Sequence, residues 1–263
     1  MQSLRTLAYN TFCVLWTLLF GLPIVTYFQV RRDPVEIRRV SRVWARGMLW
    51  GLRVFVGVTH EIKYHEAQNE RPRILAANHQ SWWETIAFLI IEPDVCIVAK
   101  SSLRKIPIFG WYVQHSPMVL IDREDKLSSL RQVTREAQDA VAQGRSVLIF
   151  PEGTRRELFS QQPMEKGVSI LYQRLQIPVV PIVHNSGVFQ GTGDARNRGG
   201  VIRVEYHQEI ATGLDRERFQ ERLQSTLSVE KDRLARDHGA SASPGITYTH
   251  ATSASIQMVV KDD

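Results

Sequence analysis

The stretch RILAANHQSWWETIAFLII, residues 73–91, decides the fold. Its apolar start predicts a short buried strand over 73–77, and residues 82–91 predict a helix. Asn78, His79 and the residues that follow therefore lie in a loop between a strand and a helix. Polar side chains in such a loop can point into one shared opening at the strand end.

The rest of the chain repeats this alternation. Apolar runs predict further strands at 95–99, 118–122, 146–150, 177–183 and 201–206. Amphipathic stretches predict further helices at 125–143, 164–175 and 215–236. Strands that alternate with helices are typical of a sheet covered by helices. We therefore expect an α/β fold with a mixed, largely parallel sheet flanked by helices.

Composition fits this fold and narrows the partners. The chain has 263 residues, of which 43% are apolar and 23% charged, as in a globular domain with small appendages. Its net charge of +6 favours anionic partners: phospholipid, a phosphorylated substrate, an acidic carrier or nucleic acid. Cys13 and Cys96 are the only cysteines and lie far apart, which excludes a disulfide framework and a cysteine zinc site.

An uncharged run, LAYNTFCVLWTLLFGLPIVTYFQV, occupies residues 7–30. As a helix it would reach ~36 Å, enough for a hydrocarbon core of ~30 Å. Gly21 and Pro23 could instead break it into a piece that enters one leaflet and returns, and a buried core helix is a further alternative. Arg31 and Arg32 close the run, and the positive-inside bias would keep the bulk of the chain cytoplasmic if the run spans.

The following segment predicts a basic amphipathic helix with Asp33 as N-cap and Pro34 as first helical residue. Four arginines fall within about 80° of one another on this helix: Arg38, Arg42, Arg46 and Arg53. The predicted apolar stripe is Ile37, Val40, Trp44, Gly47, Gly51 and Val54. Such a helix suits a leaflet surface with anionic headgroups, and a solvated face packed on the domain is the alternative.

Three regions result. We assign residues 1–57 to membrane-anchoring helices and 58–237 to an α/β domain. Residues 238–263 are small and polar, and we expect a flexible tail there.

His79 and Glu84 admit two interpretations. Ser81 and Glu84 fit S-x-x-E, a capping box that only starts a helix. Alternatively, Glu84 holds Nδ1–H of His79 and leaves Nε2 free as a general base. The chain has no G-x-S-x-G motif and no cysteine near His79, so the second interpretation implies that the substrate itself is the nucleophile.

A second polar cluster, FPEGTRR at 150–156, follows the predicted strand at 146–150. Gly153 allows close backbone approach, Thr154 offers a hydroxyl, and Arg155 carries a planar set of donors. These groups at a strand end suit a phosphate. A surface turn with an exposed arginine is the alternative.

Four blocks occur in order over about a hundred residues: NHQSWWET (78–85), PMVLIDR (117–123), FPEGTR (150–155) and VVPIV (179–183). This series resembles the glycerolipid acyltransferase superfamily and is most similar to its bacterial 1-acyl-sn-glycerol-3-phosphate acyltransferases. The resemblance implies that His79 is the base and Glu84 its partner. It implies phosphate binding by Arg155, Lys100, Arg123, Lys105, Thr154, Gly153 and Glu152. Pro181 would shape the site.

The implied activity is transfer of a fatty acyl group from acyl-CoA or acyl carrier protein (ACP) to the free hydroxyl of 1-acyl-sn-glycerol 3-phosphate. The product would be phosphatidic acid, with no metal and no cofactor beyond the thioester. Membrane phospholipid, lysophosphatidate and acyl carrier protein are the expected partners, and nucleic acid is not. The resemblance further implies a bacterial inner membrane location with the catalytic domain facing the cytoplasm.

Three departures from the family pattern accompany the match. Glu84 stands where the family more often has aspartate, Pro117 where it usually has glycine, and Met164-Glu165 precede Lys166-Gly167. Alternative functions are acylation of another lysolipid or of glycerol 3-phosphate, or non-catalytic binding of anionic lipid.

Overall fold

The computed structural model describes most of the chain, namely residues 2–28, 33–67, 71–106, 108–116, 118–121, 126–160, 162–191 and 198–240. Pro117, Arg123 and almost all of the predicted tail at 238–263 lie outside the described residues. So do Arg31 and Arg32.

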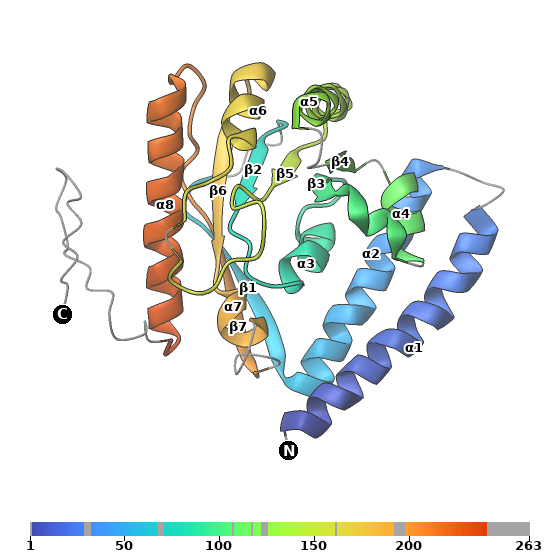
Figure 1. The fold of residues 1–263 in the computed structure, drawn as a ribbon. Coiled ribbons are helices and arrows are strands. Elements are labelled where there is room, and N and C mark those ends of the chain that lie inside the picture. The colour runs from blue at the N-terminus through green and yellow to red at the C-terminus, as the bar shows by residue number, and fades with distance from the viewer. Residues whose placement is uncertain are drawn as a thin grey trace.

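Helices and strands alternate through the domain (Figure 1). The helices are α1 (Gln2–Phe28), α2 (Pro34–Gly51), α3 (Trp83–Ile91), α4 (Phe109–His115), α5 (Lys126–Ala142), α6 (Gly167–Leu175), α7 (Ser186–Gln190) and α8 (Arg216–Asp237). A π-helical turn, η1 (Leu52–Val56), and a 3-10 helix, η2 (Ser101–Lys105), complete the helical segments. The strands are β1 (Val58–Tyr64), β2 (Ile74–Ala77), β3 (Cys96–Lys100), β4 (Val119–Ile121), β5 (Val147–Ile149), β6 (Val179–His184) and β7 (Gly200–Tyr206).

The strands form one seven-stranded sheet in the order β1-β7-β6-β2-β5-β3-β4. Every neighbouring pair is parallel except β6 and β7. The predicted mixed, largely parallel sheet is therefore confirmed. The sequence patterns did not predict β1, because this edge strand buries only Val58 and exposes most of its other side chains.

Helices cover both faces of the sheet. Ile74 and Ala76 of β2 enter a core shared with α5, α6 and α8, whereas Leu75 and Ala77 enter a core on the opposite face with α3 and α7. The first core lies on the α8 side in Figure 1, and the second lies toward the N-terminal helices. The four-residue apolar strand β2 is therefore buried on both sides.

The apolar N-terminal run forms one continuous helix. Pro23 lies inside α1, so the alternative of a break at Gly21 and Pro23 does not hold. Leu4–Ile24 has a mean hydropathy of 1.6 and only 11% of this segment is buried. By length and composition α1 is therefore sufficient to cross a membrane.

Helices α1 and α2 pack closely because two glycines of α2 leave room for aromatic rings of α1. A Cβ added at Gly47 would lie 2.2 Å from the Trp16 ring, and one at Gly51 would lie 2.3 Å from the Phe12 ring. The Trp16 indole also donates a hydrogen bond to the carbonyl of Trp44 at 3.0 Å. The predicted cap is confirmed, since the Asp33 side chain accepts from the backbone N–H of Val35 at 2.8 Å.

The basic face of α2 is divided between the domain and solvent. Arg38 and Arg42 both bind Asp94, at 2.9 and 3.1 Å, so these two guanidinium groups belong to a protein contact. The buried face of α2 is Ile37, Ser41, Ala45, Met48 and Gly51, which departs from the predicted stripe, and Val54 is 55% exposed. The alternative of a helix packed on the domain thus holds for one side of α2.

The glycine contacts generate a stability prediction. Gly47→Val should lower the free energy of unfolding by about 1–3 kcal/mol, because the new side chain displaces the Trp16 ring from α2. Urea unfolding in detergent, followed by tryptophan fluorescence, measures this change. Gly167→Val is the matched control, since a Cβ at Gly167 meets nothing within 4 Å. Equal stability of the two variants would contradict the packing described.

Candidate active site

Three adjacent parallel strands bring the polar loops together. β2 lies between β5 and β6, and it is parallel to both. His79 follows the end of β2, Glu152 follows the end of β5, and His184 is the last residue of β6. In open α/β sheets, ligands bind outside the carboxyl ends of the strands, so this edge is the expected position of a site.

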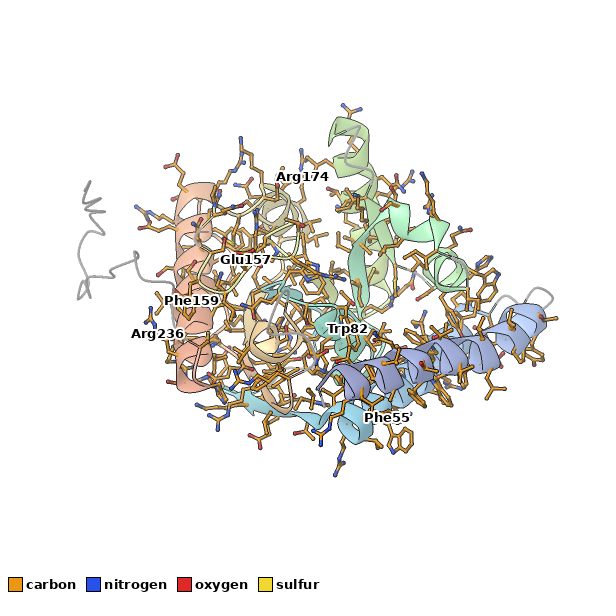
Figure 2. All side chains as sticks on the ribbon, turned by 60° about the horizontal axis from the view of Figure 1, so that its bottom comes forward. Phe55, Trp82, Glu157, Phe159, Arg174 and Arg236 are labelled. Atoms are coloured by element: carbon orange, nitrogen blue, oxygen red, sulfur yellow. The ribbon has the colours of Figure 1, made fainter. Side chains whose placement is uncertain are left out.

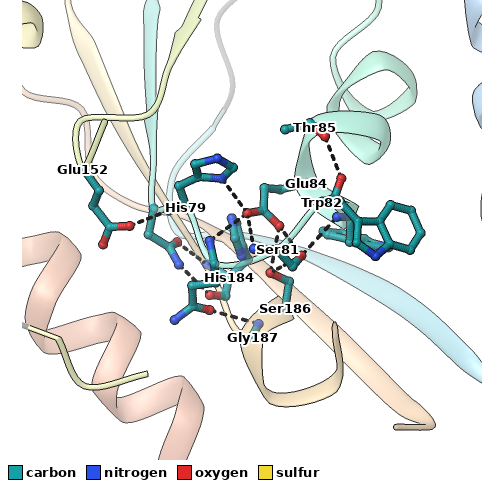
Figure 3. A network of polar contacts seen from close by, with 12 residues as sticks. His79, Ser81, Trp82, Glu84, Thr85, Glu152, His184, Ser186 and Gly187 are labelled. Atoms are coloured by element: carbon teal, nitrogen blue, oxygen red, sulfur yellow. Dashed lines mark hydrogen bonds and ion pairs between the residues drawn. The ribbon is translucent and has the colours of Figure 1, made fainter. Parts of the chain in front are cut away.

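His79 and Glu84 form the predicted pair. The Nδ1 atom of His79 lies 2.8 Å from Oε1 of Glu84 (Figure 3). The imidazole stacks on Phe150 with 4.6 Å between ring centroids, and 15% of its side chain is exposed. Nε2 makes no hydrogen bond with any described residue. The neutral imidazole that donates Nδ1–H to Glu84 therefore presents a basic nitrogen at the edge of the sheet.

The Glu84 carboxylate is fully buried and has five donors. The donors are Nδ1 of His79, the backbone N–H groups of Gln80 and Ser81, and the hydroxyls of Ser81 and Ser186. The Ser81 hydroxyl accepts from the backbone N–H of Trp83 at 3.0 Å, and the Ser81 N–H donates to Glu84 as in the carboxylate half of a capping box. The two interpretations of the motif are therefore compatible: one carboxylate starts the helix and orients the histidine.

The pKa values of two buried groups near His79, Glu84 and His184, are shifted from their ordinary values. Burial alone would raise the pKa of Glu84, but the His184 imidazole and the hydrogen bonds from His79 and Ser81 lower it to about 2. Burial lowers the pKa of His184, and the Glu84 carboxylate opposes this shift. At neutral pH Glu84 is therefore a carboxylate that can stabilise an imidazolium on His79.

Asn78 fixes the start of the loop between β2 and α3 against β6. Its amide nitrogen donates to the carbonyl of His184 at 2.9 Å, and its amide oxygen accepts from the backbone N–H of His184 at 2.9 Å. The Gln80 side chain accepts from the backbone N–H of Gly187 at 3.2 Å. The residues on both sides of His79 are thus bound to the β6–α7 segment.

The FPEGTRR loop is bound to His79 through the backbone. Oε2 of Glu152 accepts from the N–H of His79 at 2.8 Å, and the carbonyl of His79 accepts from the N–H of Arg156 at 2.8 Å. Gly153 has a positive φ of 69°, and a Cβ there would lie 2.7 Å from Cγ of Glu165. This turn therefore requires glycine for both its conformation and its close packing.

The predicted phosphate ligands have different environments. Thr154 and Arg155 are exposed, and their side chains make no hydrogen bond or ion pair with a described residue. Lys100 ends β3, the strand beside β5, and it is exposed, as is Lys105 at the end of η2. Arg123 lies outside the described residues. Phosphate binding by these side chains stays a prediction.

Glu152 differs from the other predicted phosphate ligands. It is 7% exposed, and both of its carboxylate oxygens face protein donors, one being the His79 N–H and the other the ammonium of Lys231. A carboxylate also repels a phosphate. These contacts support a role for Glu152 in holding the loop, in place of a direct contact with substrate.

One group of possible metal ligands occurs among the described residues, consisting of His65, Glu205 and His207, whose ligand atoms lie within 4.8 Å of one another. His65 follows β1, and Glu205 and His207 lie at the end of β7, where Glu205 pairs with Val183 of β6. Oε2 of Glu205 already binds His65 at 2.8 Å and Arg233 at 2.7 Å. A guanidinium at this distance opposes a metal cation on the same oxygen.

Several residues of the site had no assigned role in the sequence analysis. Ser186 lies 102 residues after Glu84 and gave no local signal. Asn78 is the first residue of the block NHQSWWET but had no assigned role, and His184 directly follows the block VVPIV. Lys231 did carry a signal, because it interrupts the apolar stripe of the last helix with a buried charge.

Residues 59–185, which contain His79, Glu84 and the FPEGTRR loop, match the family described as Acyltransferase. The chain therefore contains an acyltransferase domain. A 1-acyl-sn-glycerol-3-phosphate acyltransferase of Pseudomonas aeruginosa is 29% identical over 209 residues, which cover 78% of this acyltransferase and 79% of that protein. A protein of the same name from Saccharomyces cerevisiae is 29% identical over 144 residues, covering 54% of this chain and 48% of the yeast protein. The chain thus matches about half the length of its yeast relative.

The fold agrees with a solved structure. The crystal structure of the 1-acyl-sn-glycerophosphate acyltransferase PlsC from Thermotoga maritima superposes with a TM-score of 0.68 at 20% sequence identity. The match covers 92% of this acyltransferase and 100% of the Thermotoga chain. At this identity the likeness concerns the fold, including its N-terminal helices.

The buried Glu84 network generates a prediction for stability and activity together. Glu84→Gln should lower the free energy of unfolding by about 1–3 kcal/mol at pH 7, because an amide cannot satisfy all the donors around it. Acyl transfer per folded molecule should fall ~10²-fold, because the imidazolium loses its anionic partner. Urea unfolding and a transfer assay on the same preparation measure both effects.

The pH dependence of this stability difference tests whether the ionised Glu84 carboxylate causes it. The folded-state pKa of about 2 lies below the ordinary value of 4.5, so the stabilisation by ionised Glu84 is present above pH 4.5 and is lost as pH falls toward 2. The stability difference between wild type and Glu84→Gln should therefore shrink below pH 4.5. A difference independent of pH would contradict this assignment. Glu221→Gln, at an exposed position of α8, is the matched control.

Proposed function

We propose that this acyltransferase moves a fatty acyl group from acyl-CoA or acyl-ACP to the free hydroxyl of 1-acyl-sn-glycerol 3-phosphate, giving phosphatidic acid. The observation that carries the proposal is the His79–Glu84 pair at 2.8 Å, bound through the His79 backbone to the loop that presents Arg155. A non-catalytic lipid binder would have no use for an oriented imidazole. The names of the Pseudomonas and yeast relatives support the choice of acceptor.

The reaction is a single displacement. Nε2 of His79 removes the hydroxyl proton as the acceptor oxygen attacks the thioester carbonyl carbon. The tetrahedral intermediate then collapses, the carbon–sulfur bond breaks, and the departing thiolate receives the proton from the imidazolium. Glu84 stabilises the imidazolium between these steps. General base assistance of this kind contributes ~10²–10⁴-fold, and no metal or further cofactor is needed because the thioester is already activated.

Phosphate binding positions the acceptor. Arg155 follows Gly153 and Thr154 in a turn whose next residue, Arg156, is bonded to the His79 carbonyl. A phosphate held by the Arg155 guanidinium therefore tethers the hydroxyl close to the base. Lys100, on the strand neighbouring β5, supplies a second cation at the same edge, and Lys105 and Arg123 are further candidates.

The N-terminal helices attach the enzyme to the membrane that holds both acyl chains. One side of α1 packs on α2, and its other side exposes large apolar residues, namely Leu4, Leu7, Val14, Leu15, Leu18, Leu19 and Leu22. Trp50 and Val54 extend this surface at 57% and 55% exposure. We place the enzyme at the bacterial inner membrane with its α/β domain in the cytoplasm. Phospholipid, lysophosphatidate and, as donor, acyl carrier protein are its proposed partners.

The base assignment yields the first functional prediction. His79→Ala should lower kcat by ~10²–10⁴-fold, because no other described group replaces Nε2, and it should leave membrane attachment unchanged. The assay uses purified enzyme in mixed micelles with labelled acyl-CoA or acyl-ACP. Its acceptor panel contains 1-acylglycerol 3-phosphate, glycerol 3-phosphate and a lysophospholipid with a different headgroup. His238→Ala, at the end of α8, is the matched control.

Two results would contradict the proposal. Full activity of His79→Ala would remove the base. Transfer by the wild type to glycerol 3-phosphate or to the other lysophospholipid, without transfer to 1-acylglycerol 3-phosphate, would replace the proposed acceptor while leaving the acyltransferase chemistry in place.

The phosphate role yields the second functional prediction. Arg155→Ala should raise the KM for the phosphorylated acceptor about tenfold to a hundredfold, because a charge-assisted hydrogen bond is lost. The KM for the thioester should change little. Arg174→Ala removes an equally exposed arginine from the end of α6 and is the matched control (labelled in Figure 2). An effect confined to the thioester would assign Arg155 to the donor.

A further inference from the structure

Lys231 occupies a position where the helix pattern calls for an apolar residue. The buried side of α8 repeats every four residues through Phe219, Leu223, Leu227, Lys231 and Ala235. Lys231 is nevertheless only 3% exposed. Removing an ammonium from water costs several kcal/mol unless a partner compensates it, so a lysine at this place requires an explanation.

The contacts of Lys231 lead directly to the catalytic loop. Its Nζ lies 3.3 Å from Oε1 of Glu152 and donates to the carbonyl of Ser160 at 2.8 Å. The other oxygen of Glu152, Oε2, accepts from the backbone N–H of His79 at 2.8 Å. One buried carboxylate therefore connects the last helix of the domain to the backbone of the general base.

The second contact of Lys231 holds a strained turn. Phe159, directly before Ser160, has a positive φ of 63° although it is bulky and buried. Such a conformation persists only where the surroundings enforce it. Arg236, five residues after Lys231 on α8, lies over the Phe159 ring at 5.7 Å, and Figure 2 shows Phe159 and Arg236 beside this helix. α8 thus contacts both ends of the segment 152–160, at Glu152 and at Phe159 and Ser160.

We propose that Lys231 is a positioning residue for acyl transfer. Its ammonium neutralises Glu152 and orients this carboxylate so that the His79 backbone, and with it the imidazole, keeps one position relative to the acceptor. The proposal rests on His79 acting as the base in the proposed function, but it does not depend on which hydroxyl is the acceptor. Without Lys231, the buried carboxylate loses its compensation and turns away from the His79 N–H.

Stability alone does not account for this pair. A buried ion pair replaced as a whole by neutral residues of similar volume usually leaves a protein equally or more stable, whereas removal of one partner leaves an uncompensated charge. Lys231→Met combined with Glu152→Gln should therefore fold. The glutamine can still offer an amide oxygen to the His79 N–H, and the methionine continues the apolar stripe of α8.

The test compares Lys231→Met, Glu152→Gln and the double variant in steady-state transfer, per folded molecule, with the acceptor that the wild type uses. Lys231→Met should lower kcat about tenfold to a hundredfold, as expected when a reacting group is displaced by about 1 Å, with the KM for the thioester unchanged. The double variant should recover most of this loss. Arg222→Met removes the same charge from an exposed position of α8 and should have wild-type kcat.

A second readout needs no acceptor. Diethyl pyrocarbonate modifies accessible imidazoles, and mass spectrometry follows the rate at each histidine peptide. His79 should react severalfold faster in Lys231→Met than in the wild type, while exposed His60 on β1 should react at the same rate in both. A wild type inactive toward lysophosphatidate would therefore refute the proposed acceptor without affecting this measurement.

Three outcomes would overturn the inference. The first is a Lys231→Met enzyme with both wild-type kcat and a wild-type modification rate at His79. The second is an equal loss of kcat in Arg222→Met. The third is a double variant no more active than Lys231→Met or, where that variant does not fold, no more active than Glu152→Gln.

Discussion

The structure of the site depends on one buried anion. The Glu84 carboxylate lies in the first turn of α3 and accepts from donors of the loop after β2, among them the His79 imidazole, and from Ser186 of α7. Burial of an unpaired carboxylate here would cost a large amount of free energy, so the fold is stable only when the three segments meet around it. The same charge that organises the backbone is then available to stabilise a protonated histidine.

Around this anion the backbone of His79 is held at both of its polar atoms. Glu152 accepts its N–H and Arg156 donates to its carbonyl, so two separate parts of one loop fix a single residue. Asn78 fixes the preceding residue to β6. The His79 backbone is therefore fixed by the loop that also carries the exposed Arg155, an arrangement that suits the proposed positioning of a tethered hydroxyl.

The sequence predicts what short-range patterns encode. Strands buried on both faces, such as β2 and β5, are continuous apolar runs. The Asp33 cap and the His79–Glu84 pair are each formed by residues only a few positions apart. Long-range contacts leave no such trace. Ser186 reaches Glu84 only because β6 lies beside β2, and Arg38 and Arg42 are recruited by Asp94 on a separate loop. β1 escaped prediction because an edge strand need not bury a face, and α7 because a helix of five residues has no period.

The first helix is joined to the domain by direct contacts. Tyr9 stacks on Trp82, two residues before Glu84, at 5.9 Å, and its hydroxyl donates to the Met48 carbonyl. The orientation of α1 in any surface that it enters therefore also sets the orientation of the sheet edge that carries His79. If α1 enters a membrane as proposed, the enzyme would meet its substrates at one fixed depth.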